Sequence, residues 1–340
     1  MTTESQANEA QTYRLLLVHE TAGGHFQRSI VTRPLSALPP GEVLVRVHYS
    51  SLNYKDALSA SGNKGVTRNY PHTPGIDAAG IVEESSAGDL HPGQAVLIGH
   101  AEFGSAVPGG FSQYARVPAA WAMPLPDGLT LRASMAYGTA GITAALSVLR
   151  LQEQGVVPGS GEVLVTGATG GVGSLAVAIL SCAGYQVVAA TGKPGARQFL
   201  LDLGASQVIG RDEVNDTSGK ALLKGRWAGV VDTVGGNYLA TALRSTRYGG
   251  AVTCCGNVAA PEFTLSVYPF ILRGVRLIGI DIANSPPSLR RQLWLRLTNE
   301  WRIANLDRLV TECSLDGLDA EIERMLHGQI TGRVVVNLAN

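Results

Sequence analysis

Cysteine is scarce in this chain of 340 residues, which contains only four. They are Cys182, in a predicted helix, Cys254 and Cys255, in an apolar strand, and Cys313. Their positions lack the paired spacing of a zinc site, and they predict buried free thiols in a reducing compartment. The cysteine pattern therefore argues against a disulfide scaffold and favours a cytoplasmic protein.

An excess of one charge and long apolar runs are also lacking. The 27 basic residues balance the 27 acidic ones without any basic block, so nucleic acid and anionic membranes are not expected partners. Residues 1–11 are polar and lack the basic start and apolar run of a signal peptide. The longest apolar region, Leu175–Ala190, is interrupted by Gly184 and Gln186, which predicts helix, turn and strand instead of a membrane span.

Glycine, by contrast, is abundant, and one glycine-rich turn is the most informative stretch of the chain. The apolar run Val163–Thr166 predicts a buried parallel strand, and Ser174–Ala183 predicts a helix. A glycine-rich turn between the two presents backbone N–H groups and the positive end of the helix dipole to a phosphate. Gly170 and Gly173 keep two spacings of the dinucleotide-binding pattern, whereas Ala168 replaces its first glycine. A plain tight turn is the alternative.

The acid that usually follows such a turn in NADH-binding proteins is missing. Gln186–Ala190 predicts the next strand, and Asp or Glu is expected near its end. Here the chain places Thr191, Lys193 and Arg197, and no acid occurs before Asp202. A hydroxyl and two cations suit a 2′-phosphate, so the pattern favours NADPH over NADH. The alternative is that both cations are solvated surface residues.

The length of the chain predicts two domains. Short strand candidates separated by proline and glycine fill Tyr13–Pro126, which indicates a β-rich, barrel-like domain. After a helical stretch at Ala133–Gln152, strands and helices alternate as in a doubly wound parallel sheet. Ser288–His327 is predicted to be helical, and the β-like run Arg333–Leu338 most simply returns to the first domain.

Several short motifs occur together in a characteristic order along nearly the whole chain. They are Ser51-Leu52-Asn53-Tyr54-Lys55-Asp56, Pro74-Gly75-Ile76-Asp77, Gly138-Thr139-Ala140-Gly141, the Gly170 turn, Leu203-Gly204-Ala205, Asp232-Thr233-Val234-Gly235, Pro269-Phe270-Ile271-Leu272-Arg273 and Gly332-Arg333. With them the chain resembles the zinc-free medium-chain dehydrogenases/reductases, in the quinone oxidoreductase-like branch that includes NADPH-dependent acrylyl-CoA reductases. The resemblance implies an α/β protein with three segments. They are a GroES-like catalytic domain (12–132), a Rossmann NADPH-binding domain (133–285) and a return to the catalytic domain (286–340).

Zinc members of this superfamily carry a cysteine in the segment where this chain has Asn53–Asp56, and a four-cysteine loop elsewhere. Both features are missing from the sequence, so the resemblance implies a site without metal. His72 is the nearest candidate ligand, and without a cysteine partner it is read as a loop histidine. The expected reaction is then reduction of an activated C=C bond, in which hydride goes to the β-carbon and a proton to the α-carbon.

Such a reduction builds negative charge on the substrate carbonyl oxygen, which requires hydrogen-bond donors. Tyr54 is the best donor candidate, and Asn53 and Asp56 lie in the same polar turn after a strand. These three are the predicted catalytic residues. The alternatives are a half-buried core tyrosine at position 54 and an aspartate that caps a helix beginning at Ala57.

The resemblance also implies cofactor contacts by position. Arg211 would add a cation near the adenosine phosphate, with a surface arginine paired to Asp212 as the alternative. Asn257 follows an apolar strand, where a sheet edge faces a ligand crevice. The predicted cofactor-binding residues are Tyr54, Thr169, Gly170, Gly171, Val172, Thr191, Gly192, Lys193, Arg197, Arg211, Asn257 and Ile271.

A CoA thioester requires cations for its phosphates. Lys64, Arg68 and Arg333 are the predicted substrate contacts, with Arg273 as a further candidate, and each is otherwise a solvated charge. The loop His100–Pro108 departs from the branch and is expected to reshape the substrate mouth.

The leading hypothesis is NADPH-dependent reduction of acryloyl-CoA or a similar short enoyl-CoA. Reduction of free quinones or enones is the second hypothesis, and an NADPH-binding sensor or structural protein is the third. The apolar segment Arg276–Asp281 would be an open sheet edge in a monomer. By analogy with the superfamily, it predicts a homodimer.

Overall fold

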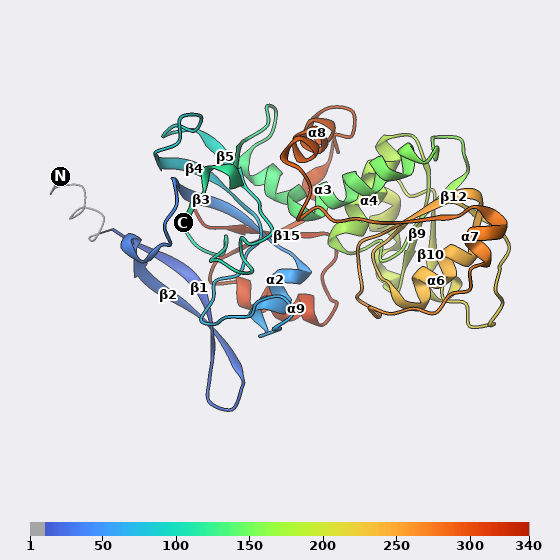
Figure 1. Cartoon of the computed structure of the whole chain (residues 1–340), viewed down its shortest axis with the longest axis horizontal. Helices are drawn as coiled ribbons and strands as arrows, with labels where there is room; N and C mark the ends of the chain where they lie inside the picture. Colours follow the sequence, from blue (N-terminus) through green and yellow to red (C-terminus); the bar gives the residue numbers. More distant parts are fainter. Residues whose placement is uncertain (1–10, 340) are drawn as a thin grey trace. The chain divides into compact units, whose positions relative to one another are not determined.

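The computed structural model describes residues 11–339, and the chain divides into two compact units (Figure 1). The first unit contains the chain up to Thr139 and again from Leu306, and the second contains Ala140–Asn305. The sequence placed these changes at 132/133 and 285/286, whereas the structure places them at 139/140 and 305/306. The polar residues 1–10, for which no signal peptide is predicted, lie outside the described part of the chain.

The first unit is built on a seven-stranded sheet in which the last strand of the chain is an interior member. β15 (Arg333–Asn337) lies between β14 (Val310–Ser314) and β3 (Val43–Leu52). The chain therefore returns to its first unit through β15. The other strands of the unit are β4 (Ala78–Ser85), β5 (Ala95–Ile98), β6 (Tyr114–Val117) and β7 (Ala122–Pro124), with a separate hairpin of β1 (Thr12–Glu20) and β2 (Phe26–Pro34).

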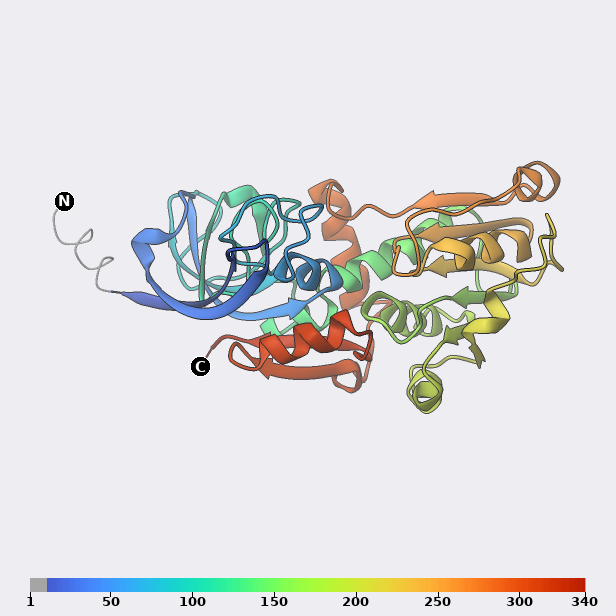
Figure 2. The same cartoon turned by 90° about the horizontal axis from the view of Figure 1, so that it is seen from below.

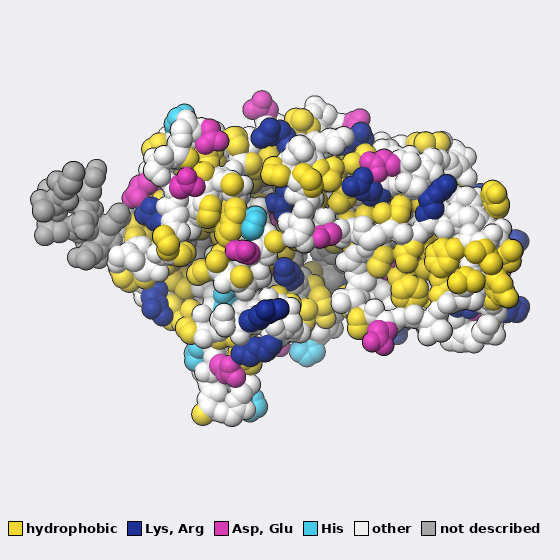
Figure 3. Space-filling model, viewed as in Figure 1, with side chains coloured by type: hydrophobic (Ala, Val, Ile, Leu, Met, Phe, Trp, Pro, Cys, Tyr) yellow, Lys and Arg dark blue, Asp and Glu magenta, His cyan; other side chains and the backbone are white. Residues whose placement is uncertain are grey.

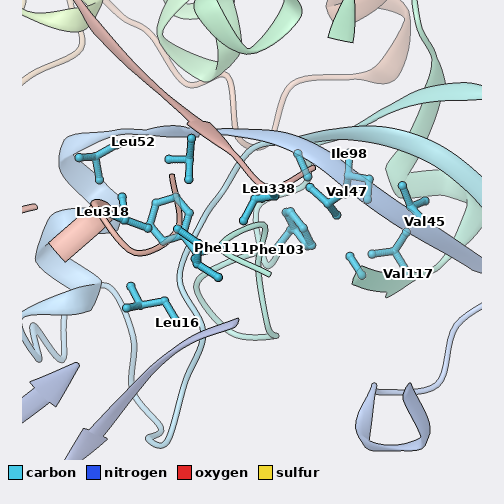
Figure 4. Close-up of a cluster of buried hydrophobic side chains, with 14 of the residues drawn as sticks. Leu16, Val45, Val47, Leu52, Ile98, Phe103, Phe111, Val117, Leu318 and Leu338 are labelled. Atoms are coloured by element: carbon cyan, nitrogen blue, oxygen red, sulfur yellow. The ribbon is translucent and has the colours of Figure 1, made fainter. Parts of the chain in front are cut away.

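Side chains on one face of β3 contribute to the core of this unit. Val43, Val45 and Val47 are buried on one face of the strand, and Phe103 and Phe111 of a later loop belong to the same buried cluster (Figure 4). Burying each of these side chains contributes roughly 1.5–3 kcal/mol to stability. Two helices, α2 (Tyr54–Ala60) and α9 (Leu318–Leu326), close the cluster, and α9 lies beside β14 (Figure 2).

Six parallel strands form the sheet of the second unit in the order β10-β9-β8-β11-β12-β13. Its strands and helices are β8 (Glu162–Val165), α4 (Gly171–Cys182), β9 (Gln186–Thr191), α5 (Arg197–Asp202), β10 (Gln207–Gly210), β11 (Trp227–Asp232), α6 (Gly236–Ser245), β12 (Thr246–Cys254), α7 (Tyr268–Arg273), β13 (Arg276–Gly279) and α8 (Pro287–Thr298). The chain order reverses at β8, which has β9 on one side and β11 on the other. Right-handed crossovers then place α4 and α5 on one face and α6 on the other. The predicted doubly wound sheet is confirmed.

Helix α3 (Leu131–Glu153) is interrupted by a kink at Gly138, where φ is 51° and ψ is −157°. A Cβ at this position would lie 2.6 Å from Asp77 Oδ2 and 2.7 Å from Ser51 Oγ. Only glycine therefore fits, both because of the backbone conformation and because polar side chains of the first unit touch the kink.

The strand candidates within Tyr13–Pro126 are Leu15–Val18, Glu42–Tyr49, Ala78–Glu83, Ala95–Ile98 and Phe111–Val117, so the sequence did not predict β2 and β7. It also did not predict β14. β14 falls inside the range Ser288–His327 that was predicted to be helical. All three are edge strands whose side chains are mostly exposed or half-buried. They therefore lack the buried alternation by which a strand is recognised in a sequence.

Candidate active site

A glycine turn joins β8 to α4 at the centre of the second unit's sheet. Gly167 has a φ of +57°, and a Cβ on Gly173 would lie 2.3 Å from the carbonyl oxygen of Gly167. Both positions require glycine. Because α4 begins at Gly171, the N–H groups of its first turn have no partner within the helix and favour an anion. The predicted contacts Thr169, Gly170, Gly171 and Val172 all lie in this turn.

A buried polar network ties this turn to the neighbouring strand β11. The Thr166 hydroxyl donates to Asp232 Oδ1 at 2.7 Å, and the Gly235 N–H donates to Asp232 Oδ2 at 2.8 Å. The Thr233 hydroxyl donates to the Thr166 carbonyl at 2.9 Å. Burial raises the pKa of Asp232. These supports were not predicted from the sequence, although polar residues at the ends of two apolar strands were a signal.

A cluster of polar and cationic residues lies at the end of β9, beside the glycine turn. The Thr169 and Thr191 hydroxyls are 3.4 Å apart, and the Lys193 N–H donates to Thr191 Oγ1 at 3.1 Å. A Cβ on Gly192 would lie 2.8 Å from Arg211 Cδ, so the Arg211 side chain passes over Gly192. The structure therefore brings these predicted cofactor residues together.

Two arginines near this cluster, Arg197 and Arg211, differ in whether the side chain is already hydrogen-bonded to the protein. Within residues 11–339, no ion pair joins Arg211 to Asp212, the alternative considered from the sequence. Arg197 uses Nη1 to donate to the Val208 carbonyl at 3.0 Å. Arg211 is therefore the better candidate for a bound anion.

The structure separates Ile271 from this cluster. Arg273 of the same helix, α7, donates to the carbonyls of Arg244 at 2.9 Å and Thr246 at 3.1 Å, and Thr246 begins β12. The glycine turn, by contrast, follows the carboxyl end of β8. All strands of the sheet are parallel. Ile271 therefore lies near the amino ends of the strands, whereas the glycine turn lies at their carboxyl ends, so Ile271 is not part of this site. Asn257 is exposed and follows the carboxyl end of β12, so it lies at the same end of the strands as the glycine turn.

The three predicted catalytic residues stand where β3 passes into α2. Tyr54 is the first residue of α2 and is 39% exposed, so it is not a core tyrosine. Asn53 and Asp56 are buried. The helix begins at Tyr54 and not at Ala57, and Asp56 Oδ2 accepts the backbone N–H of Asn53 at 2.9 Å, which caps the first turn.

Asp56 is a fully buried carboxyl group with several donors. Its Oδ2 also accepts Asn53 Nδ2 at 3.1 Å, and its Oδ1 accepts the N–H groups of Gly75 at 3.2 Å and Ile76 at 2.9 Å. Burial and the negative charge of Asp77 raise the pKa of Asp56 to about 7. The site therefore holds a carboxyl group that titrates near neutral pH.

A second buried carboxylate, Asp77, was not singled out from the sequence. It accepts the Ser51 hydroxyl at 2.6 Å, Asn53 Nδ2 at 2.8 Å and the Thr139 hydroxyl at 2.7 Å. Arg333 completes the network by donating to Asn53 Oδ1 at 3.1 Å and Ser51 Oγ at 2.9 Å. The Asn53 amide is thus bonded at both ends. Asn53 and Asp56 hold the turn in place, and Tyr54 is the member of the three that projects outward.

The predicted substrate cations have different surroundings. Arg333 is 2% exposed and burial lowers its pKa, which corrects the expectation that it meets a substrate phosphate. Lys64 is 2.8 Å from Glu20 Oε2 and lies over the rings of Phe26 and Tyr70. Arg68 is exposed. Arg68 is therefore the most available of the predicted substrate cations.

His72 is buried, and its backbone pairs with Val18 in the first unit. Burial lowers the pKa of its ring. In the part of the chain that the structure describes, no three His, Cys, Asp or Glu side chains gather as a metal site would require. No helix there is both long and apolar enough to cross a membrane.

Comparison with known proteins places both units in one superfamily. Residues 39–127 match the alcohol dehydrogenase GroES-like domain, and residues 171–298 match the zinc-binding dehydrogenase domain. Acrylyl-CoA reductase AcuI of Ruegeria pomeroyi is 44% identical to this chain, over 95% of this chain and 98% of its own length. The chain belongs to the medium-chain dehydrogenase/reductase superfamily.

Two solved structures of the superfamily are very similar to this chain. YhdH of Escherichia coli with bound NADPH is 43% identical, with a TM-score of 0.92 over 96% of this chain and 100% of its own. YhfP of Bacillus subtilis with bound NAD is 43% identical, with a TM-score of 0.93 over 97% and 100%. The latter protein is named "Putative quinone oxidoreductase YhfP". These superfamily members differ in bound cofactor, so the preference of this chain rests on its own residues.

Proposed function

We propose that this protein is an NADPH-dependent reductase that saturates the activated C=C bond of acryloyl-CoA or a similar short enoyl-CoA. The observation that carries the proposal is its 44% identity, over 95% of the chain, to an acrylyl-CoA reductase. Each of the two units of the structure holds one part of the proposed chemistry.

The second unit has residues that fit NADPH. The turn between Gly167 and Gly173 supplies N–H groups for a pyrophosphate, and Thr191, Lys193 and Arg211 supply a hydroxyl and two cations for a 2′-phosphate. No acid stands among residues 191–197 to select a free 2′-hydroxyl. NADPH, when bound, supplies the hydride.

The first unit supplies the proposed donor to the substrate. Tyr54 is exposed at the start of α2, and we assign its hydroxyl the hydrogen bond to the carbonyl oxygen on which charge develops. Asn53 and Asp56 are too deeply buried to touch a substrate, so we assign them to positioning the turn that carries Tyr54. Arg68 is the proposed cation for a CoA phosphate.

Reduction of quinones or enones is the second candidate function. It is favoured by the name of the Bacillus subtilis relative, which is 46% identical over 302 residues. The cofactor site is the same in both functions, and they differ in whether CoA phosphates are bound.

The test is to follow NADPH oxidation separately with acryloyl-CoA, crotonyl-CoA and a benzoquinone. Saturation at low acryloyl-CoA concentration supports the proposal, and turnover with quinone alone supports the second function. Tight NADPH binding without turnover on any of the three supports a sensor or structural protein instead.

In the same assay Tyr54→Phe should lower kcat with acryloyl-CoA at an unchanged Tm. An unchanged kcat removes Tyr54 from its proposed role.

We also propose that the protein is a cytoplasmic homodimer joined through the edge of the second unit's sheet. β13 is the last strand of that sheet, and Leu277 on it is 38% exposed. Figure 3 shows apolar side chains gathered over the α7 end of this unit. The exposed apolar residues of this edge are Val267, Tyr268, Phe270, Ile271, Leu272 and Leu277. A second copy would cover them and pair the open strand.

A further inference from the structure

Four glycines press one loop of the first unit against the segment that supports Asp56. Gly104, Gly109 and Gly110 belong to a loop that ends at Phe111, and Gly75 lies on the facing segment. A Cβ on Gly109 would lie 2.3 Å from the Gly75 carbonyl oxygen, and a Cβ on Gly104 would lie 2.4 Å from the same atom. Backbone therefore meets backbone with no side chain between. We call these four residues the glycine seam.

The backbone–backbone hydrogen bonds across the glycine seam run in one direction. The loop donates N–H groups, and the facing segment accepts them with its carbonyls: Gly109 to Thr73 at 2.8 Å, Gly110 to Gly75 at 2.7 Å and Phe111 to Pro74 at 3.0 Å. The next N–H groups of the facing segment, those of Gly75 and Ile76, donate to Asp56 Oδ1. The loop thus fixes the backbone that delivers two donors to the buried carboxyl group.

The loop is itself anchored in the core. Phe103 and Phe111, near its two ends, have no exposed surface and belong to the main buried cluster of the first unit. The part of the loop that forms the seam is therefore a fixed support, although Glu102, Ala106 and Pro108 on its outer side are exposed.

We propose that Gly109 is a positioning residue for the proposed reaction: by allowing the two backbones to touch, it holds the Gly75 and Ile76 N–H groups on Asp56 and so fixes the turn that carries Tyr54. This role rests on the proposed reductase function, while the hydrogen bonds to Asp56 can be tested without any substrate. A methyl group at position 109 requires the backbones to separate by about 1 Å, because ordinary contact begins at 3.4 Å and the available space is 2.3 Å.

The test compares Gly109→Ala with Gly88→Ala. Neither glycine has a positive φ, and a Cβ on Gly88 meets nothing within 4 Å, so the pair isolates crowding at the seam. In Gly109→Ala, amide hydrogen exchange at Gly75 and Ile76 should accelerate about tenfold or more, and kcat/KM with acryloyl-CoA should fall about tenfold, the effect of one lost hydrogen bond to a charged group. Gly88→Ala should change neither. Unchanged exchange at Gly75 and Ile76 in Gly109→Ala overturns the proposal, whatever the activity.

A double-mutant cycle separates positioning from general damage. In an Asp56→Asn background, Gly109→Ala should change kcat/KM by less than about twofold; an equal loss in both backgrounds means that the seam acts elsewhere. If Gly109→Ala does not fold, exchange is measured in Asp56→Asn alone. Gly75 and Ile76 should then exchange faster while Gly109 and Gly110 stay protected, and equal loss at all four overturns the proposal. If no substrate turns over, the exchange results stand and only the proposed function fails.

Discussion

Arg211 is the residue on which the cofactor preference depends most directly, because its side chain passes over Gly192 at the end of β9. Arg211→Ala should weaken NADPH binding about 10–100-fold, the range for a lost hydrogen bond to a charged group, and change NADH binding by less than about twofold. Fluorescence titration with both cofactors measures this ratio. Lys224→Ala removes an exposed cation elsewhere in the same unit and should leave both affinities unchanged. Equal losses for NADPH and NADH would contradict the assignment of the 2′-phosphate site.

Asp56 makes the stability of the protein depend on pH. Its pKa rises from 3.8 in the unfolded chain to about 7 in the folded protein. Between these values the folded protein keeps a proton that the unfolded chain releases, so the free energy of unfolding falls as pH rises towards 7 and is level above it. Between pH 5 and pH 8 the titration of Asp56 therefore lowers the free energy of unfolding by about 2–3 kcal/mol.

Urea unfolding at pH 5 and pH 8 measures this contribution. Asp56→Asn should lose it, so its free energy of unfolding should change less between the two pH values than that of the wild type. Asp127→Asn replaces an exposed aspartate and should keep the wild-type difference. The same pH dependence in Asp56→Asn and wild type would rule out Asp56 as its source.

At the scale of elements, the kink in α3 is tied to the buried network. At Gly138, an added methyl group would meet Asp77, Ser51 and Arg333 as well as a strained backbone. Gly155 also has a positive φ, of 82°, but open space around it. Gly155→Ala should therefore cost about 1–2 kcal/mol of stability, and Gly138→Ala at least ~3 kcal/mol because crowding is added. Chemical unfolding of both variants checks this, and similar losses would show that the network tolerates the methyl group.

The elements that could be predicted from the sequence are those with a buried face. β8, β9 and the glycine turn were recognised because apolar runs and glycines mark them, whereas β2 and β14 were missed because their side chains are largely exposed. For the site, the Thr191 and Lys193 cluster was predicted, since adjacent residues bring it together. The pairing of Arg333 with Asn53 and Ser51 was not, because contacts between distant parts of the chain leave no local pattern.

At the scale of the whole molecule, the exposed edge strand β13 leads to a prediction about assembly. The wild type should have twice the mass of one chain by light scattering, and Leu277→Lys should shift it to the monomer because it places a charge in the proposed interface. Leu295→Lys changes a leucine of α8 that is 54% exposed and should leave the mass unchanged. A monomeric wild type would refute the homodimer.

The position of β15 has a consequence for how the protein is made. This strand, from the last residues of the chain, lies between β14 and β3, and its Arg333 bonds to residues at the end of β3. During synthesis the second unit is complete before β15 has left the ribosome, so it is able to fold while the first unit still lacks an interior strand and the partner of Asn53. The turn that carries Tyr54 is therefore completed only after the second unit has been synthesised, because Asn53 waits for Arg333, 280 positions further along the chain.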